Sequence, residues 1–262
     1  MPKYIRFIAC SIVALLCSCT SGESEPKQAG VRIVSLSPSI TASLIDMGFN
    51  EELVGRSAFC EEVGSAIPVV GDLYAVDYEQ LLRLQPTHVF LQQQVGGIDS
   101  HLEELAENGA FVLRSWELNT IEDIKKLSTD LSTVFRIDQS QVDFEFNKFA
   151  ISVDPTLLMT GGSKQSVGIC FGRNTYLDDI WEAIGGVNAL KKEGWQMLSL
   201  EDIARLSPSR ILIVSDTHFT SRSPVESLGI PVIQFVHKDV LIPSTRIVQV
   251  AQSLQEQMVK TQ

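Results

Sequence analysis

The chain has 262 residues, of which 44% are hydrophobic and 20% are charged, and its formal net charge is −11. An excess of acidic residues repels a polyanion, and the sequence has no basic patch with interleaved aromatic residues, so we expect no binding to nucleic acid. The length is sufficient for two α/β lobes that each have a core.

The N-terminus is typical of an exported lipoprotein. An apolar run over residues 7–16 is too short to cross a bilayer core of about 30 Å as a helix, which favours a cleaved signal over a membrane span. The sequence Leu-Cys-Ser-Cys over residues 16–19 has the form of a lipobox, with a small residue before the cysteine. We therefore predict a signal peptide over residues 1–18 and lipidation of Cys19, with cleavage as an ordinary secretory signal as the alternative.

A polar segment over residues 19–30 follows the signal. It is rich in Ser, Gly, Glu, Pro and Gln and cannot bury a core, so we predict a flexible tether. Loss of residues 1–18 removes two cations and no acid, which lowers the formal net charge from −11 to −13. We expect the protein in the periplasm or the outer cell envelope, held to a membrane through Cys19.

Residues 31–118 are predicted to form a first lobe. The segment over residues 31–36 is typical of a buried strand, and the helix that follows has proline in its first turn and ends at Gly48. Two irregular segments, residues 56–64 and 71–76, are placed at strand ends. Because ligand-binding loops gather at the carboxyl ends of strands in open α/β sheets, we expect these loops to face a ligand.

A ten-residue phrase occurs twice, over residues 77–86 and 199–208, with Glu, Arg, Leu and Pro repeated at a constant spacing of 122 residues. Each copy begins with a residue able to cap a helix and has a polar partner three positions later, and each ends in a proline that stops the helix. An apolar run typical of a buried strand follows each copy. The repeat predicts an α/β fold of two similar lobes, with mainly parallel sheets and a ligand cleft between the lobes.

Residues 119–154 are predicted to bridge the lobes. Apolar residues step by three and four over residues 121–135, which predicts an amphipathic helix. We expect residues 142–149 to be helical as well. The second lobe is predicted over residues 155–262, and its last helix over residues 244–258.

The sequence carries no recognisable catalytic motif. It lacks the spacing of a phosphate-binding P-loop, the G-x-S-x-G nucleophile elbow and the H-E-x-x-H zinc motif. The four histidines are scattered without the spacing of metal ligands. The residues themselves therefore indicate no catalytic constellation, and we expect no metal centre and no cofactor of the protein's own.

Several residues are candidates for ligand contact. Trp195 lies in a predicted loop just before the second copy of the repeat, so it either fills the core or faces the cleft. Tyr74 occupies a comparable loop of the first lobe. Phe171 and Asn174 belong to a turn ahead of a predicted helix, and His218 is placed in a loop of the second lobe.

Glu79 and Glu201 occupy the same place in the two copies of the repeat, in the first turn of each predicted helix. One interpretation is that they only complement the helix dipole. The other is that one exposed carboxylate on each lobe offers a two-point docking site for basic residues of a partner. Surface charges contribute little by default, so the residues alone favour the first interpretation.

Cys60 and Cys170 are the two cysteines that lie beyond the lipobox. They could pair in an oxidising compartment. However, we expect them in different lobes, where a disulfide would lock the cleft, and the geometry of such a bond is strict. Unpaired thiols are therefore favoured, with a disulfide as the alternative.

Together, these motifs resemble the helical-backbone periplasmic binding proteins of ABC importers, which serve cobalamin, haem and iron-siderophores. The resemblance runs from about residue 32 to residue 258. Besides the repeat, it is carried by residues 32–39, 185–188 and 244–246. It implies two α/β lobes joined by a long helix, a limited hinge and no catalysis.

The resemblance also implies ligands and partners. A corrinoid, haem or ferric siderophore would bind between the lobes and pass to an ABC permease and ATPase complex, and the protein is expected to be a monomer. Glu79 and Glu201 match the two lobe-surface glutamates that engage permease arginines in this family, which favours the docking interpretation.

Pocket positions of the family match this chain in part. Trp195 matches a pocket tryptophan of cobalamin-binding members, and Phe59 falls near a pocket aromatic residue. Tyr74 lies where a tryptophan is expected, and Gln92 lies in a region where another ring often occurs, so we expect a more polar pocket. The ligand-binding candidates are therefore Phe59, Tyr74, Gln92, Phe171, Asn174, Trp195 and His218.

Two alternatives remain open. A transition-metal carrier of similar architecture would need three or four His, Asp or Glu ligands that converge in the cleft, and the sparse histidines disfavour it. A secreted enzyme on this scaffold would need a nucleophile paired with a base, and no such pair is visible in the sequence.

Overall fold

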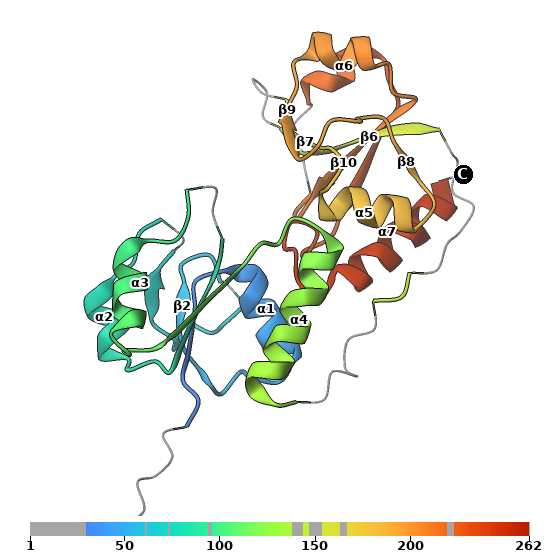
Figure 1. Ribbon diagram of the computed structural model, residues 1–262. Helices are drawn as coiled ribbons and strands as arrows, with labels where there is room; N and C mark the ends of the chain where they lie inside the picture. Colours follow the sequence, from blue (N-terminus) through green and yellow to red (C-terminus); the bar gives the residue numbers. More distant parts are fainter. Residues whose placement is uncertain are drawn as a thin grey trace, which may run out of the picture. The chain divides into compact units, whose positions relative to one another are not determined.

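Two β-sheets with flanking helices organise the folded chain (Figure 1). The first sheet lies within residues 33–116 and the second within residues 155–236, and helix α4 lies between them in the sequence. The computed structural model describes residues 30–60, 62–72, 74–93, 96–137, 144–146, 154–162, 167–218 and 223–261.

The first sheet is wholly parallel and has the strand order β3-β2-β1-β4-β5. Its central strand β1 is buried at every position, as the apolar sequence predicts for a parallel strand covered on both faces. The elements of this half are β1 (Ile33–Ser35), α1 (Pro38–Asp46), β2 (Leu53–Ser57), β3 (Val69–Gly71), α2 (Tyr78–Arg83), β4 (His88–Gln92), α3 (Ser100–Glu107), β5 (Val112–Trp116) and α4 (Ile121–Phe135).

The second sheet has the order β11-β10-β6-β7-β9, and β8 pairs with β6. Strands β6, β8, β10 and β11 are parallel, whereas β7 runs antiparallel to both β6 and β9. The elements of this half are β6 (Pro155–Thr160), β7 (Ile169–Phe171), α5 (Tyr176–Ala183), β8 (Val187–Asn188), β9 (Trp195–Met197), α6 (Leu200–Leu206), β10 (Arg210–Ser215), the 3-10 helix η2 (Pro224–Leu228), β11 (Val232–Val236) and α7 (Ile247–Thr261).

The mixed second sheet differs from the mainly parallel sheet that the sequence predicts, and one connection explains the difference. Strands β1 and β2 are joined through helix α1, but only residues 161–168 separate β6 from β7. A parallel crossover needs a dozen or more residues, so this short link returns the chain antiparallel. Strand β7 of this hairpin pairs in turn with β9, which contains Trp195. The prediction that Trp195 lies in a loop is therefore wrong.

The repeated phrase forms the same unit in both halves. Helices α2 and α6 begin at Tyr78 and Leu200, and strands β4 and β10 begin at His88 and Arg210, at the spacing of the sequence repeat. The next helix differs, because α3 in the first copy is replaced by the 3-10 helix η2 in the second. The predicted order of helix, strand, helix and strand is therefore confirmed in both copies.

The two repeat helices also begin and end in the same way. The side chains of Asp77 and Ser199 accept hydrogen bonds from backbone N–H groups in the first turn, as the capping pattern predicts. At the other end, Gln85 and Ser207 adopt left-handed conformations, with φ of 46° and 48°. Each precedes a proline, which disfavours the right-handed helical conformation.

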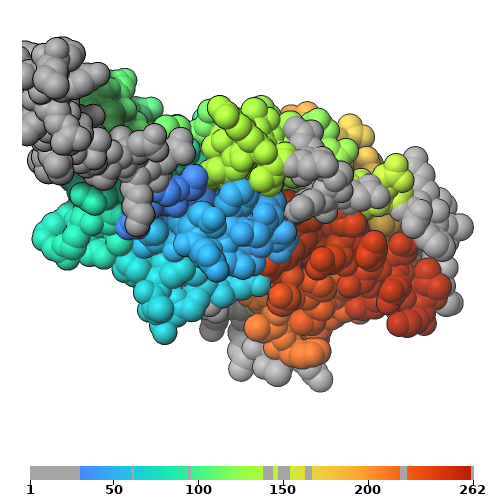
Figure 2. Space-filling model, turned by 90° about the horizontal axis from the view of Figure 1, so that it is seen from below, coloured from blue at the N-terminus to red at the C-terminus, as the bar shows by residue number. Residues whose placement is uncertain are grey.

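One hydrophobic cluster contains side chains from both halves of the chain. Helix α4 contacts α1 of the first half and α5 of the second, and α5 in turn contacts α7. These four helices lie together between the two sheets in Figure 1. Figure 2 shows the blue surface of the first half against the red surface of the C-terminal segment. In addition, residues of α1 bond Thr245 and Arg246, which precede α7. The second sheet is thus joined to the first by packed helices as well as by the chain.

Helix boundaries differ from the predictions at two places. Helix α4 ends at Phe135 as predicted, and Arg136 closes it in a left-handed conformation. Residues 144–146 are not helical, and the remainder of the predicted helix over 142–149 lies outside the described residues. The last helix begins at Ile247 rather than at residue 244, because the side chains just before it are used in bonds to α1.

Residues 31–262 form one compact unit. The lobe boundaries predicted at residues 118 and 154 therefore stay predictions. Cys19 and most of the tether lie outside the described residues. Within the described part of the chain, no helix has the length and the apolar character that crossing a membrane requires.

Candidate functional site

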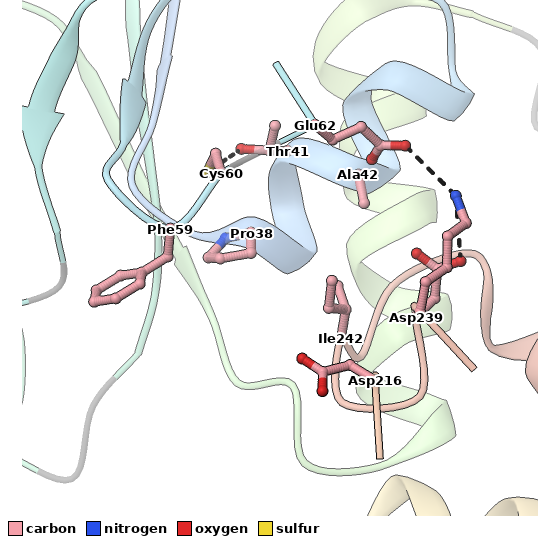
Figure 3. A pocket seen from close by; sticks show the side chains of 10 residues that line it. Pro38, Thr41, Ala42, Phe59, Cys60, Glu62, Asp216, Asp239 and Ile242 are labelled. Atoms are coloured by element: carbon pink, nitrogen blue, oxygen red, sulfur yellow. Dashed lines mark hydrogen bonds and ion pairs between the residues drawn. The ribbon is translucent and has the colours of Figure 1, made fainter. Parts of the chain in front are cut away.

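A cavity of about 390 Å³ is lined by residues from both halves of the chain (Figure 3). In Figure 3 the residues of helix α1 and of the neighbouring loop face the loops that carry Asp216 and Asp239. The lining consists of Pro38, Thr41, Ala42, Phe59, Cys60, Glu62, Asp216, Lys238, Asp239 and Ile242.

The first wall of the cavity is built at the carboxyl ends of β1 and β2. Pro38 starts helix α1 three residues after the buried end of β1, and this start turns Thr41 toward the loop that follows β2. The Thr41 hydroxyl lies 2.8 Å from the Ser35 hydroxyl and 3.1 Å from the Cys60 sulfur. Phe59, in the same loop, keeps 65% of its surface exposed. The wall therefore combines a fixed polar floor with an aromatic ring that is free to contact a ligand.

The second wall is built from loops at the carboxyl ends of β10 and β11. Asp216 directly follows β10, and Lys238, Asp239 and Ile242 follow β11. These two strands are parallel neighbours, so their carboxyl ends meet at one edge of the second sheet. Both sheets thus present their carboxyl edges to the same cavity, which is where open α/β sheets bind ligands.

Arg246 lies beside the cavity and joins the two walls. Its guanidinium donates to Asp46 on α1 at 2.8 Å and to Glu62 in the first-half loop at 2.6 Å. It also donates to Asp239 of the second half at 3.4 Å. Only 8% of the Arg246 side chain is exposed, and its charge-assisted bonds hold three carboxylates at one place.

Trp195 belongs to an aromatic stack that is bonded to the loop of the second wall. Its ring packs on Phe171 with the centroids 4.6 Å apart, and on Tyr176 at 6.0 Å. The Tyr176 hydroxyl donates to the Val240 carbonyl at 2.9 Å, in the loop that carries Lys238 and Asp239. The stack therefore supports the second wall, and burial raises the pKa of the Tyr176 phenol.

The predicted ligand residues fall into different places. Phe59 lines the cavity, whereas Trp195 is 44% exposed and is not one of the lining residues. Phe171 is fully buried, so in this structure it supports Trp195 rather than reaching a ligand. Gln92 lies at the carboxyl end of β4, where its side chain accepts a hydrogen bond from Ser37 at 3.4 Å. Asn174 is exposed ahead of α5 with φ of 60°.

Two further predicted residues do not line the main cavity. Tyr74 is 82% exposed and borders a separate pocket of about 20 Å³ that is lined in part by the loops ahead of α2 and α3. His218 is exposed and follows β10 two residues after Asp216. The structure brings neither side chain into the lining, although His218 shares a loop with a lining residue.

Glu79 and Glu201 are equally exposed, with 83% of each side chain accessible. Each lies in the first turn of its repeat helix and pairs with an arginine four positions later, Arg83 or Arg205. This arrangement satisfies the helix-dipole interpretation. It also leaves one matching carboxylate at the surface of each half, as docking requires.

Sequence reasoning missed most of the charged lining. Asp216 directly follows β10, and Lys238 lies two positions after the end of β11, so the expectation that strand ends carry ligands could have found them. The network around Arg246 had no local signal, because Asp46 and Glu62 are about 200 positions away. Among the described residues, no group of three or more His, Cys, Asp or Glu side chains is arranged to hold a metal ion.

Cys60 and Cys170 are both free and buried. Burial raises the pKa of each thiol, to about 12 for Cys170. Cys60 borders the cavity but only 2% of it is exposed. The unpaired state favoured by the sequence is the one that the structure has.

Comparison with known proteins identifies the fold. Residues 33–137 match the family described as periplasmic binding protein, which is the family that the sequence motifs resemble. No curated protein sequence matches the chain.

Solved structures of periplasmic binding proteins resemble the whole folded part of the chain. The haem-binding protein RhuT from Roseiflexus sp. RS-1 is 21% identical with a TM-score of 0.65, and the alignment covers 87% of this chain and 97% of that one. The vitamin B12-binding protein BtuF of Vibrio cholerae is 15% identical with a TM-score of 0.59, over 87% and 96% of the chains.

A third similar structure belongs to an ABC-type Fe3+-hydroxamate transport system from Saccharomonospora viridis DSM 43017. It is 14% identical with a TM-score of 0.62, over 86% and 92% of the chains. The protein therefore has the α/β fold of periplasmic binding proteins, and the predicted fold class is confirmed.

Proposed function

We propose that this protein is a lipid-anchored substrate-binding protein of an ABC importer. It captures a corrinoid, haem or ferric siderophore in the cavity between its two halves and delivers it to the permease. The observation that carries the proposal is the cavity of about 390 Å³ at the carboxyl edges of both sheets. The three similar structures bind or transport ligands of these classes, as their descriptions state.

The proposed location follows from the family and from the N-terminus. The matched family is periplasmic, and a lipid on Cys19 would tie the folded part to a membrane through residues 20–30. We propose a monomer with lobes over residues 31–118 and 155–262 and a bridge over residues 119–154. Mass spectrometry of the membrane fraction tests the anchor, because a diacylated or triacylated Cys19 is expected as the first residue. An unmodified N-terminus elsewhere would remove the anchoring proposal.

The ligand class is tested by purifying the protein from its native host. Corrinoids, haems and ferric siderophores absorb visible light differently, so the spectrum of the co-purified ligand identifies the class. The Phe59→Ala variant, purified in parallel, is expected to retain at least about tenfold less ligand, because aromatic walls supply much of the contact in such sites. The Tyr74→Ala variant, outside the cavity, is the matched control. If both variants retain the same amount of ligand, the ligand does not bind in this cavity.

Delivery to the permease is proposed to use Glu79 and Glu201, one on each half. A double substitution, Glu79→Ala with Glu201→Ala, is expected to leave ligand affinity unchanged while permease affinity falls at least about tenfold, because docking charges act only in the complex. A transport assay beside a ligand titration measures both. The paired variant Arg83→Ala with Arg205→Ala breaks the same surface ion pairs without removing the carboxylates. Normal uptake by the glutamate variant would show that these residues serve only their helices.

A further inference from the structure

The charged side chains of the cavity are mainly acidic. Its lining contains three acidic residues, Glu62, Asp216 and Asp239. Among the lining residues that the structure describes, Lys238 is the one basic residue. The Lys238 ammonium lies 3.9 Å from Glu62 and 3.8 Å from Asp239, so its charge is already shared between two carboxylates. A ligand that enters the cavity therefore meets no uncommitted cation among the described lining residues.

The nearby guanidinium of Arg246 is committed as well. It forms two hydrogen bonds with Glu62, at 2.6 and 2.7 Å, and further bonds with Asp46 and Asp239. Because the side chain is 8% exposed, it cannot turn toward a ligand without breaking these bonds. Arg246 thus balances acids of the wall and leaves nothing for an anionic ligand.

Two carboxylate groups keep unused capacity to accept hydrogen bonds. Asp216 is exposed, and its carboxylate accepts a hydrogen bond from the Thr217 hydroxyl at 3.3 Å. Asp239 is 3% exposed, and its Oδ2 atom has no hydrogen-bond partner, since Lys238 comes no closer than 3.8 Å. An ionised carboxylate only accepts hydrogen bonds. The cavity is therefore complementary to a ligand that donates.

We propose that the cavity selects ligands whose peripheral groups are neutral or cationic donors, such as amides, hydroxyls or an ammonium, over the same scaffold bearing carboxylates. This inference deepens the proposed function and rests on it. A peripheral carboxylate within a few ångströms of Asp216 meets a like charge in a partly desolvated site, where the repulsion is much stronger than in bulk water. An amide or ammonium at the same place donates to the exposed Asp216 carboxylate instead, while the buried Asp239 adds negative charge beneath it.

The test uses matched ligands that differ in charge but share a scaffold. The three pairs are cyanocobalamin and its monocarboxylate, made by hydrolysis of one side-chain amide, then the bis-amide of haem and haemin, and then ferrioxamine B and its N-succinyl derivative. Dissociation constants are measured by tryptophan quenching or calorimetry at low salt. On the scaffold that binds, the amide or amine member is expected to bind at least about tenfold more tightly than its carboxylate partner.

Two variants connect the preference to the cavity. Asp216→Asn is expected to reduce the ratio of the two dissociation constants in a ligand pair at least about threefold, because it removes the charge repulsion but keeps the shape of the side chain. Glu107→Gln makes the same charge change on exposed α3, outside the lining, and is expected to leave the preference unchanged. A carboxylate member that binds as tightly as its partner overturns the inference while the proposed function stands. Failure of all three scaffolds overturns the proposed function itself.

Discussion

Trp195 is much more exposed to solvent than the other two tryptophans of this protein. The other two tryptophans, Trp116 and Trp181, are 5% and 0% exposed, whereas Trp195 is 44% exposed. It is held by the rings of Phe171 and Tyr176 on one side, so its other side remains exposed. From the sequence, Trp195 could either fill the core or contact a ligand. Its half-exposed position argues against core filling and agrees with ligand contact.

We expect Trp195 to report ligand binding. In the wild-type protein the ligand should change the tryptophan fluorescence and reduce its quenching by acrylamide, because a ligand beside Trp195 shields the exposed ring. The Trp195→Ala variant should lose most of both responses, and Trp195→Phe should keep the ligand affinity within about threefold, since a ring still covers the site. If Trp195→Ala responds to the ligand as the wild type does, Trp195 lies outside the binding site.

The two cysteines provide a second test at the residue scale. Burial raises the pKa of both thiols, so the reactive thiolate is scarce at neutral pH. In a chain that starts at residue 20, a thiol reagent at pH 8 should label neither cysteine in the folded state and both in urea. The rate should stay low up to pH 9, because the raised pKa postpones ionisation. Rapid labelling of the folded protein would contradict the buried positions of Cys60 and Cys170.

At the scale of elements, helix α4 takes part of its N-terminal cap from the second half. Thr120 and Asp123 form a capping box within the helix. In addition, the Asp179 carboxylate on α5 accepts the Ile121 N–H at 2.8 Å. Because the first N–H groups of a helix have no partner inside it, this bond stabilises both the start of α4 and its contact with α5.

The Asp179→Ala variant is therefore expected to lower the free energy of unfolding by about 1–2 kcal/mol, the usual cost of losing a helix cap. Urea denaturation measures the change. Glu122→Ala, in the same first turn but with 85% of its side chain exposed, is the control and should change stability much less. If the two variants lose similar free energies of unfolding, the bond from the Ile121 N–H to Asp179 does not stabilise the protein.

The same residue predicts a dependence on pH. Burial, followed by the nearby carboxylates, raises the pKa of Asp179 above its ordinary value of 3.8. The folded state thus favours the protonated form, and the stability that this form contributes is lost as the pH rises from about 4 through the raised pKa. Asp179→Asn cannot ionise. The free energy of unfolding of Asp179→Asn should therefore increase relative to that of the wild type between pH 4 and pH 7. If the difference between the two free energies stays constant over this range, the raised pKa of Asp179 is contradicted.

For the whole molecule, the network around Arg246 ties residues about 200 positions apart in the sequence. Thr245 and Arg246 precede α7 and bond Asp46 at the end of α1, and Arg246 continues to Glu62 and Asp239. Together with the hydrophobic cluster of α1, α4, α5 and α7, this network decides which loops of the two halves face the cavity.

Arg246→Met should destabilise the protein by about 3–5 kcal/mol, because it leaves buried or half-buried carboxylates without their cation. Denaturant unfolding monitored by circular dichroism measures the change. Arg83→Met removes an arginine of an exposed ion pair, 65% accessible, and should cost less than about 1 kcal/mol. Equal effects of the two substitutions would show that the Arg246 network does not hold the halves together.

Much of the fold could be predicted because its signals are local. The repeat at a spacing of 122 residues located α2, α6, β4 and β10, since capping residues, terminal prolines and apolar runs each act within a few positions. The amphipathic period likewise located α4. The strand ends that carry Phe59 and Gln92 followed from the same elements.

The antiparallel hairpin, the burial of Phe171 and the charged lining of the cavity were decided by tertiary structure. Strand β9 exists because β7 is beside it, and Phe171 is buried because Trp195 and Tyr176 pack on it. Asp216, Lys238 and Arg246 meet residues of the first half only when the four central helices pack. Local propensity and spacing determined the elements of this protein. Its site depends on contacts between residues far apart in the chain, and such contacts leave no periodic pattern in a single sequence.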